Sequence, residues 1–155
     1  MSSESKIAIV YYSKHHGNTL QLLEYISQEY LVDLIDASKS TQIDLSQYKV
    51  VGFASGIYFG KFHKSVVDTA RKCLPDGVPV FFIYTYGSKQ KNQTRAIAAA
   101  VSEHSCPIWG EYGCRGYDTF GPFKMIGGLN KDHPDGMDLH QALLFYETII
   151  RHEVG

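Results

Sequence analysis

The chain has 155 residues, which is close to the usual length of one domain. Its fifteen Lys and Arg and sixteen Asp and Glu give a formal net charge of −1, which argues against general binding to nucleic acid or to a membrane surface. No apolar run approaches the ~20 residues that span a bilayer, and residues 1–5 lack the apolar core of a signal peptide. The chain has three cysteines, Cys73, Cys106 and Cys114, which is an odd number. Their spacing does not match that of a zinc site. We therefore expect reduced, buried thiols in a cytoplasmic protein, with no metal site and no membrane insertion.

Residues 6–19 combine a strand with a polar turn. After Lys6, residues 7–12 are apolar and rich in β-branched and aromatic side chains, as in a strand covered on both faces. Ser13, Gly17, Asn18 and Thr19 follow, and apolar residues then recur at helical spacing to about residue 29. Such a turn offers a phosphate group hydroxyls and the N–H groups of a helix N-terminus. The alternative is an ordinary turn in which Asn18 or Thr19 caps the helix.

The remaining chain alternates strands and helices. We predict further strands at residues 31–36, 48–54, 78–84 and 108–114, and helices at 63–74, 92–102 and 138–152. This order predicts a doubly wound α/β domain that spans residues 1–155, with a parallel sheet between helices on both faces. In such a sheet the carboxyl ends of the strands share one edge, and ligands bind where the strand order reverses.

Three polar, glycine-containing segments follow the first, third and fourth predicted strands. The first segment contains Ser13, Gly17, Asn18 and Thr19. The second is Ser55-Gly56-Ile57-Tyr58-Phe59-Gly60, and the third is Thr85-Tyr86-Gly87-Ser88. In this combination and order the chain resembles the flavodoxin family along nearly all its length. The resemblance implies a five-stranded parallel sheet of order 2-1-3-4-5 and a bound FMN. It also implies that the cofactor is held by residues of all three segments, which are Ser13, His15, His16, Gly17, Asn18, Thr19, the residues 55–60 and the residues 85–88. By the same resemblance Phe59 stacks on the flavin, and Gly60 belongs to the peptide that reorients when the flavin is reduced.

The sequence departs from the family pattern in several places. Three residues rather than two separate Ser13 from Gly17, and a histidine replaces a hydroxyl, so His15 or His16 either donates to the phosphate or faces solvent. The chain is near neutral where flavodoxins are strongly acidic, and Ser88 stands where many members carry an aromatic residue. The flavin segments are followed by basic residues, which are Lys61, His63, Lys64, Lys89 and Lys91.

Residues 115–137 show little periodicity. A segment of this length without regular structure is usually functional or disordered, and its aromatic residues argue against disorder. Two interpretations are open. The segment covers the flavin edge with Tyr117, Phe120 or Phe123, or it packs on the sheet edge as a surface flap.

Two functions suit this set of features. The first is an FMN-binding electron carrier, a monomer or weak dimer, that serves redox partner proteins or a small electron acceptor. The second is an FMN-dependent reductase of quinones or other small acceptors. The segment at 55–63 is partly similar to the menaquinone-dependent protoporphyrinogen dehydrogenases, and the near-neutral charge favours this second function. A signalling domain with a phosphoacceptor Asp is disfavoured, because the first and third strands end in Tyr12-Ser13 and Ala54-Ser55 rather than in acids.

Overall fold

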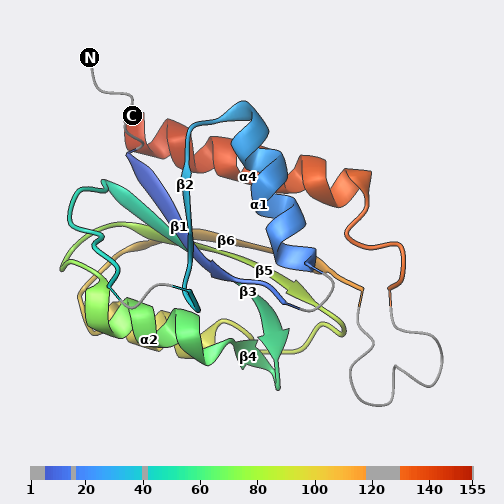
Figure 1. Ribbon diagram of the computed structural model, residues 1–155, viewed down its shortest axis with the longest axis horizontal. Coiled ribbons are helices and arrows are strands. Elements are labelled where there is room, and N and C mark those ends of the chain that lie inside the picture. Colours follow the sequence, from blue (N-terminus) through green and yellow to red (C-terminus); the bar gives the residue numbers. More distant parts are fainter. Residues whose placement is uncertain (1–5, 15–16, 40–41, 118–129, 155) are drawn as a thin grey trace.

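The computed structural model describes residues 6–14, 17–39, 42–117 and 130–154. One parallel sheet forms the centre of the molecule, and helices cover both of its faces (Figure 1). The elements follow in the order β1 (Ile7–Tyr12), α1 (Asn18–Glu29), β2 (Asp33–Asp36), β3 (Val50–Tyr58), β4 (Lys61–Phe62), α2 (Lys64–Cys73), β5 (Val80–Tyr86), α3 (Arg95–Ser102), β6 (Ile108–Arg115) and α4 (Gly136–Val154).

The strand order is β2-β1-β3-β5-β6, and every pairing along this path is parallel. The doubly wound fold predicted from the sequence is therefore confirmed, with β4 as an addition that pairs antiparallel with the end of β3. The chain moves to one side of β1 to form β2 and to the other side to form β3. The strand order thus reverses at β1, which is where an open α/β sheet leaves a crevice.

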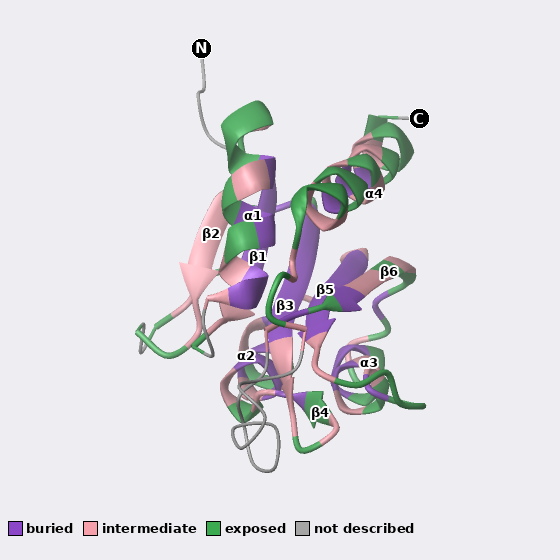
Figure 2. Cartoon of the chain, turned by 90° about the vertical axis from the view of Figure 1, so that its right-hand side faces the viewer, coloured by how far each residue is buried: buried purple, intermediate pink, exposed green. Residues whose placement is uncertain are grey.

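The core has two halves because successive side chains of a strand point to opposite faces. Ile7 and Ile9 of β1 face α1 and α4, whereas Ala8 and Val10 face α2 and α3. Figure 2 shows the buried strands enclosed between the two helix layers. Each fully buried aliphatic side chain stabilises the fold by ~1.5–3 kcal/mol relative to exposure. Gly52 of β3 leaves room for a ring of this core, since a Cβ there would lie 2.4 Å from Phe81.

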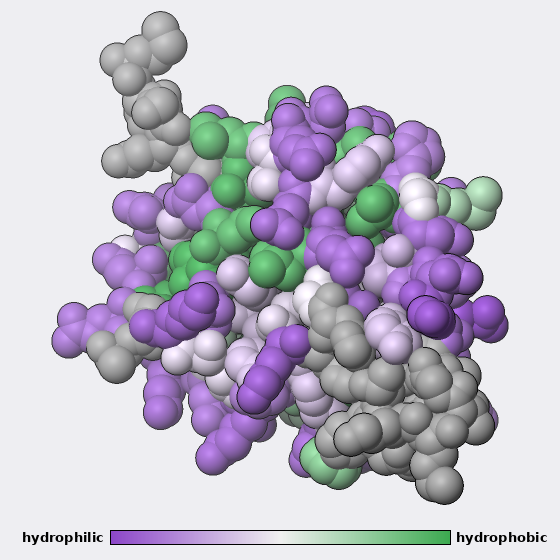
Figure 3. Space-filling model, turned by 45° about the vertical axis from the view of Figure 1, so that its right-hand side comes forward, coloured by the Kyte–Doolittle hydropathy of each residue, from purple (hydrophilic) through white to green (hydrophobic). Residues whose placement is uncertain are grey.

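Apolar side chains also reach the surface. Among the described residues the large exposed ones are Leu31, Phe59, Ile108, Met137, Leu144 and Val154. Figure 3 shows hydrophobic patches, in green, on a face that is mainly hydrophilic. No described helix is long and apolar enough to cross a membrane.

The strand expected at 31–36 begins at Asp33, and the helix expected at 92–102 begins at Arg95. Three further corrections concern elements at the carboxyl edge of the sheet. The strand expected to end at residue 54 continues to Tyr58, so the segment expected as a loop is a β-hairpin with β4. The strand expected at 78–84 lies two residues later, and Thr85 and Tyr86 belong to β5. Neither Asn18 nor Thr19 caps α1, because Gly17 occupies the cap position at φ +63° with no side-chain cap bond.

The cysteines are all free, but Cys73 is only half-buried. Cys106 and Cys114 are buried, and desolvation raises the pKa of the Cys114 thiol to about 12. A thiol with so high a pKa is a poor nucleophile at neutral pH.

Candidate functional site

A pocket of about 210 Å³ opens at the carboxyl edge of the sheet, where β1, β3 and β5 end. It is lined by Ser13, Asn18, Thr19, Gly56, Ile57, Tyr58, Phe59, Gly60, Thr85, Tyr86, Gly87, Ser88, Gln90, Gln93, Gly116 and Tyr117. Twelve of these were predicted as cofactor-binding residues from the sequence. The lining carries hydroxyl, amide and aromatic groups, and no described residue in it is Asp, Glu, Lys, Arg, His or Cys.

Two described residues of the predicted site, Gly17 and Ser55, do not line the pocket, and two further predicted residues are not described. His15 and His16 lie outside the described part of the chain. Gly17 supplies the left-handed turn into α1. Ser55 lies beneath the pocket, where its hydroxyl donates to the Gly56 carbonyl and accepts from the backbone N–H of His63 at 2.9 Å. Ser55 therefore ties the end of β3 to the start of α2.

The turn after β1 is organised by hydroxyl groups. The Ser13 hydroxyl accepts a hydrogen bond from the backbone N–H of Leu20 at 3.0 Å, which secures one N–H of the first helical turn. The Thr19 hydroxyl lies 2.8 Å from that of Thr85, and Thr19 is fully buried. In this pair one hydroxyl donates to the other, so one proton remains for a further acceptor. The pair also fixes the start of α1 against the end of β5.

Asn18 joins the turn to the segment after β6. Its side-chain amide donates to the carbonyl of Tyr117 at 2.8 Å, and a Cβ at Gly116 would lie 2.7 Å from the same amide nitrogen. Gly116 therefore keeps space for Asn18. The Oδ1 atom of Asn18 is buried and has no hydrogen-bond partner among the described residues. An acceptor left unpaired in this way costs about 1–3 kcal/mol, which a ligand donor can recover.

Gln93 presents a second unpaired acceptor. It is 4% exposed, and its side-chain nitrogen donates to the Ser88 carbonyl at 3.0 Å. Its Oε1 atom is buried and accepts no hydrogen bond from the part of the chain that the structure describes. Gln90 and Gln93 were missed from the sequence, because they lie in a continuous polar stretch in which nothing distinguishes a buried glutamine from an exposed one.

The β3–β4 hairpin forms one wall of the pocket. Its two central residues, Phe59 and Gly60, have φ angles of +52° and +80°, the left-handed pair that a tight hairpin requires. Phe59 is 86% exposed at the tip. Behind it the His63 ring stacks on Tyr12 with 3.8 Å between centroids, and both rings meet Tyr58 at their edges.

His63 also caps α2. Its Nδ1 accepts from the backbone N–H of Ser65 at 3.1 Å, which requires an unprotonated Nδ1. Desolvation by burial lowers the pKa of His63, in agreement with a neutral ring. His63, one of the basic residues that follow the flavin segments in the sequence, therefore supports the hairpin and does not line the pocket.

Lys89 follows Ser88 of the lining but does not itself line the pocket. Its ammonium group donates to the Tyr84 hydroxyl at 2.6 Å and lies 4.9 and 5.0 Å from the ring centroids of Tyr84 and Tyr86. The hydrogen bond to Tyr84 raises the pKa of Lys89, so the charge persists at neutral pH. The Tyr84 hydroxyl is also 3.3 Å from Glu111.

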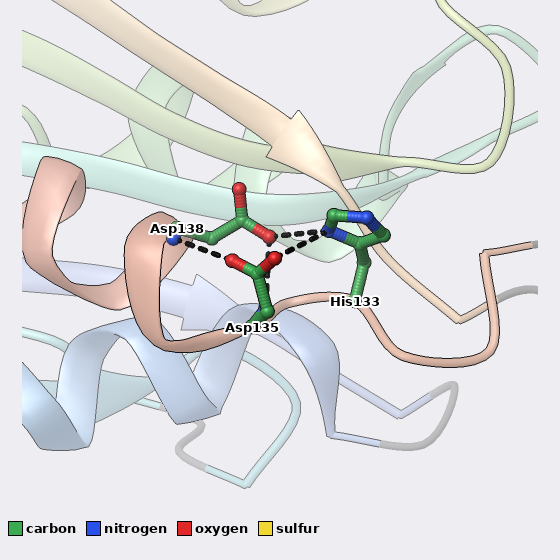
Figure 4. A group of neighbouring side chains, drawn as sticks. All are labelled: His133, Asp135 and Asp138. Carbon is green, nitrogen blue, oxygen red and sulfur yellow. Dashed lines mark hydrogen bonds and ion pairs between the residues drawn. The ribbon is translucent and has the colours of Figure 1, made fainter.

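His133, Asp135 and Asp138 form a compact group at the start of α4 (Figure 4). Asp135 accepts from the backbone N–H of Asp138 at 2.9 Å, and Asp138 accepts from the backbone N–H of Asp135 at 2.8 Å and from His133 at 2.6 Å. The two aspartates form a capping box that begins α4 directly after the long segment. Asn130 anchors the same segment by donating to the Gly87 carbonyl at 2.6 Å.

The long segment was predicted to cover the flavin edge or to pack as a flap. Tyr117 at its start lines the pocket, and Asn130 near its end binds the loop after β5. Phe120 and Phe123 lie outside the described residues.

The parallel sheet with this strand order, and a pocket at the point where that order reverses, define a doubly wound α/β protein with a ligand crevice between β1 and β3. The model of the Flavodoxin_5 family, a flavodoxin domain, matches residues 9–106. The chain therefore belongs to the flavodoxin family.

The chain is also similar to individual proteins. An uncharacterized protein of Methanocaldococcus jannaschii is 34% identical over 148 residues, which cover 94% of this chain and 99% of that protein. Among solved structures, a flavodoxin from the domain Archaea has a TM-score of 0.66 at 16% identity, with 97% of this chain and 100% of that chain covered. The two-electron reduced flavodoxin of Megasphaera elsdenii has a TM-score of 0.59 at 16% identity, with 88% and 97% covered. At these identities the structural matches show a shared fold.

Proposed function

We propose that the pocket binds FMN and that the protein carries electrons through it. The observation that carries the proposal is the pair of buried, unpaired acceptors, Asn18 Oδ1 and Gln93 Oε1, in an otherwise uncharged pocket at the reversal of the strand order. A flavin nucleotide brings the matching groups, since its ring and ribityl chain contain N–H and O–H donors.

The remaining parts of FMN also find matching groups. The N-terminus of α1, with the spare proton of the Thr19–Thr85 hydroxyl pair beside it, suits a terminal phosphate without a cation. Tyr58, Phe59, Tyr86 and Tyr117 offer aromatic surface to the ring system. When bound, the flavin supplies the redox chemistry, and these residues bind and orient it.

The lining favours a carrier over a reductase with its own acid–base chemistry. A reductase that protonates its substrate usually places a general acid beside the reacting atoms. The described lining holds no histidine, cysteine, carboxylate or lysine for that role.

The colour and contents of the purified protein test this proposal. We expect a yellow protein that releases FMN, and neither FAD nor riboflavin, when it is denatured and the extract is chromatographed. A colourless protein whose visible spectrum and melting temperature do not change with added FMN would overturn the proposal. Reduction of a quinone by a reduced nicotinamide, faster than flavin released from the protein can account for, would favour the reductase.

A further inference from the structure

Basic residues flank the residues that line the pocket. Lys14, Lys61, Lys89, Lys91 and Arg115 each stand next in the chain to a residue of the lining, and all five are exposed. They are called the basic rim below. No described acidic residue stands next to a lining residue, although Asp118, outside the described part, follows Tyr117. One third of the fifteen Lys and Arg residues thus borders a single pocket in a chain of net charge −1.

The basic rim lies on both sides of the pocket. Lys14 and Lys61 flank the hairpin, since the backbone N–H of Lys14 reaches the Tyr58 hydroxyl at 3.4 Å and Lys61 pairs with Tyr58 in the sheet. Arg115 pairs with Tyr86 at the end of β6, and Lys91 follows Gln90. Lys14, Lys61, Lys91 and Arg115 form no ion pair with a described residue, whereas Lys89 is occupied with Tyr84.

The position of these charges distinguishes a protein partner from a small anion. A small anionic substrate inside the pocket would meet no cationic side chain among the described lining residues, and the N-terminus of α1 is the part that suits the FMN phosphate. The exposed basic residues instead stand next to the lining, which carries the exposed Phe59. An apolar centre within a charged rim is the usual anatomy of a protein–protein interface.

We propose that the basic rim docks an acidic redox protein over the mouth of the pocket. This inference rests on the proposed FMN-dependent function for its electron transfer, but the docking itself depends only on charge and shape. One electron leaves the reduced partner and enters the bound flavin, or passes in the opposite direction. The rim steers the acidic face of the partner toward the site and so raises the association rate.

An acidic [2Fe–2S] ferredoxin serves as the probe, and basic cytochrome c as its counterpart. The double variants Lys14→Gln/Lys61→Gln and Lys91→Gln/Arg115→Gln remove rim charge on either side of the pocket. Lys49→Gln/Lys72→Gln is the matched control, since both lysines are exposed, with Lys49 immediately before β3 and Lys72 near the end of α2. Fluorescence anisotropy gives the dissociation constant for labelled ferredoxin. Stopped-flow absorbance gives the rate constant for electron transfer from reduced ferredoxin to the FMN-loaded protein.

We expect both ferredoxin affinity and rate to fall as salt is raised, and each removed rim charge to weaken them about two- to fivefold at low salt. The control should change either value less than about twofold. Ferredoxin binding without any flavin uptake would support the docking and overturn the proposed function. Three results would overturn the docking: a rate or affinity independent of salt, an equal loss in the control, or tighter binding of cytochrome c. Rim variants that lower the electron-transfer rate with the small anion ferricyanide, but leave the rate with ferredoxin unchanged, would also overturn the docking.

Discussion

Asn18 is the residue on which the ligand argument depends most. Asn18→Ala removes the unpaired Oδ1 acceptor and the hydrogen bond to Tyr117. We expect FMN affinity to fall about tenfold, which corresponds to ~1.4 kcal/mol, the size of one lost hydrogen bond. Titration of the ligand-free protein with FMN, followed by flavin fluorescence, gives the dissociation constant. An unchanged constant in a variant with native circular dichroism would place the ligand elsewhere.

Individual site residues were predictable where local chemistry singled them out. Hydroxyl, amide and glycine residues directly after a strand predicted Ser13, Asn18 and Thr19, and all three line the pocket. Gln93 was not predictable, because its burial depends on the loop after β5 folding back on it. The partner of the Thr19 hydroxyl, Thr85, lies 66 positions away, and no local pattern indicates that contact.

The hairpin of β3 and β4 combines strain with exposure. Phe59 occupies a left-handed conformation that asparagine adopts more readily, and it is 86% exposed. Phe59→Asn should therefore raise the free energy of unfolding by ~0.5–1 kcal/mol while it weakens FMN binding. Urea denaturation of the ligand-free protein and an FMN titration measure the two effects.

Gly60→Ala is the matched control for the hairpin. A Cβ there meets no atom closer than 3.9 Å, so its effect comes from the φ of +80° alone and should be destabilising. A Phe59→Asn variant that is less stable than the wild type would contradict the strain argument. Unchanged FMN affinity would remove Phe59 from the binding surface.

The end of helix α2 carries a pH-dependent contact. His104 Nε2 lies 2.8 Å from the Arg71 carbonyl and Nδ1 lies 3.0 Å from Asp76, so both nitrogens donate only in the protonated ring. The hydrogen bond to Arg71, followed by that to Asp76, raises the pKa of His104 above its ordinary 6.5. The protonated ring therefore adds stability that is fully present below pH 6.5 and is lost as the pH rises through the folded-state pKa.

His104→Gln measures this contribution. We expect the variant to be less stable than the wild type by ~0.5–1 kcal/mol at pH 5.5 and the difference to shrink by pH 8.5. The lowered pKa of His63 has the opposite effect on stability, but it is present in both proteins and cancels in the difference. A difference that does not vary with pH would contradict the assignment.

Element types were predictable from hydrophobic period, whereas several ends were not. Alternation and apolar runs identified every strand of the main path, but β3 continues four residues beyond its predicted end at residue 54. Its last residues carry a serine and a glycine, which resemble a loop in sequence, and the pairing with β4 keeps them extended. A two-residue partner strand such as β4 is too short to leave a pattern of its own.

At the scale of the whole molecule, the alternation of strands and helices was sufficient to predict the parallel sheet. Its strand order came from the family resemblance, and the structure confirms both. The same order places three separate polar segments at one edge, which is why sequence analysis could predict a single site. The basic rim was only partly predictable. Its lysines follow the flavin segments in the sequence, but the turn of Lys89 toward Tyr84 depends on the folded side chains.

Competition between FMN and riboflavin for the ligand-free protein tests the central claim most directly. The two ligands share the ring and the ribityl chain, so their difference isolates the phosphate at the start of α1. With two hydrogen bonds to the charged phosphate, each worth about 1.5–3 kcal/mol, FMN should bind at least about 100-fold more tightly. Equal dissociation constants for FMN and riboflavin, or binding of neither, would contradict the account.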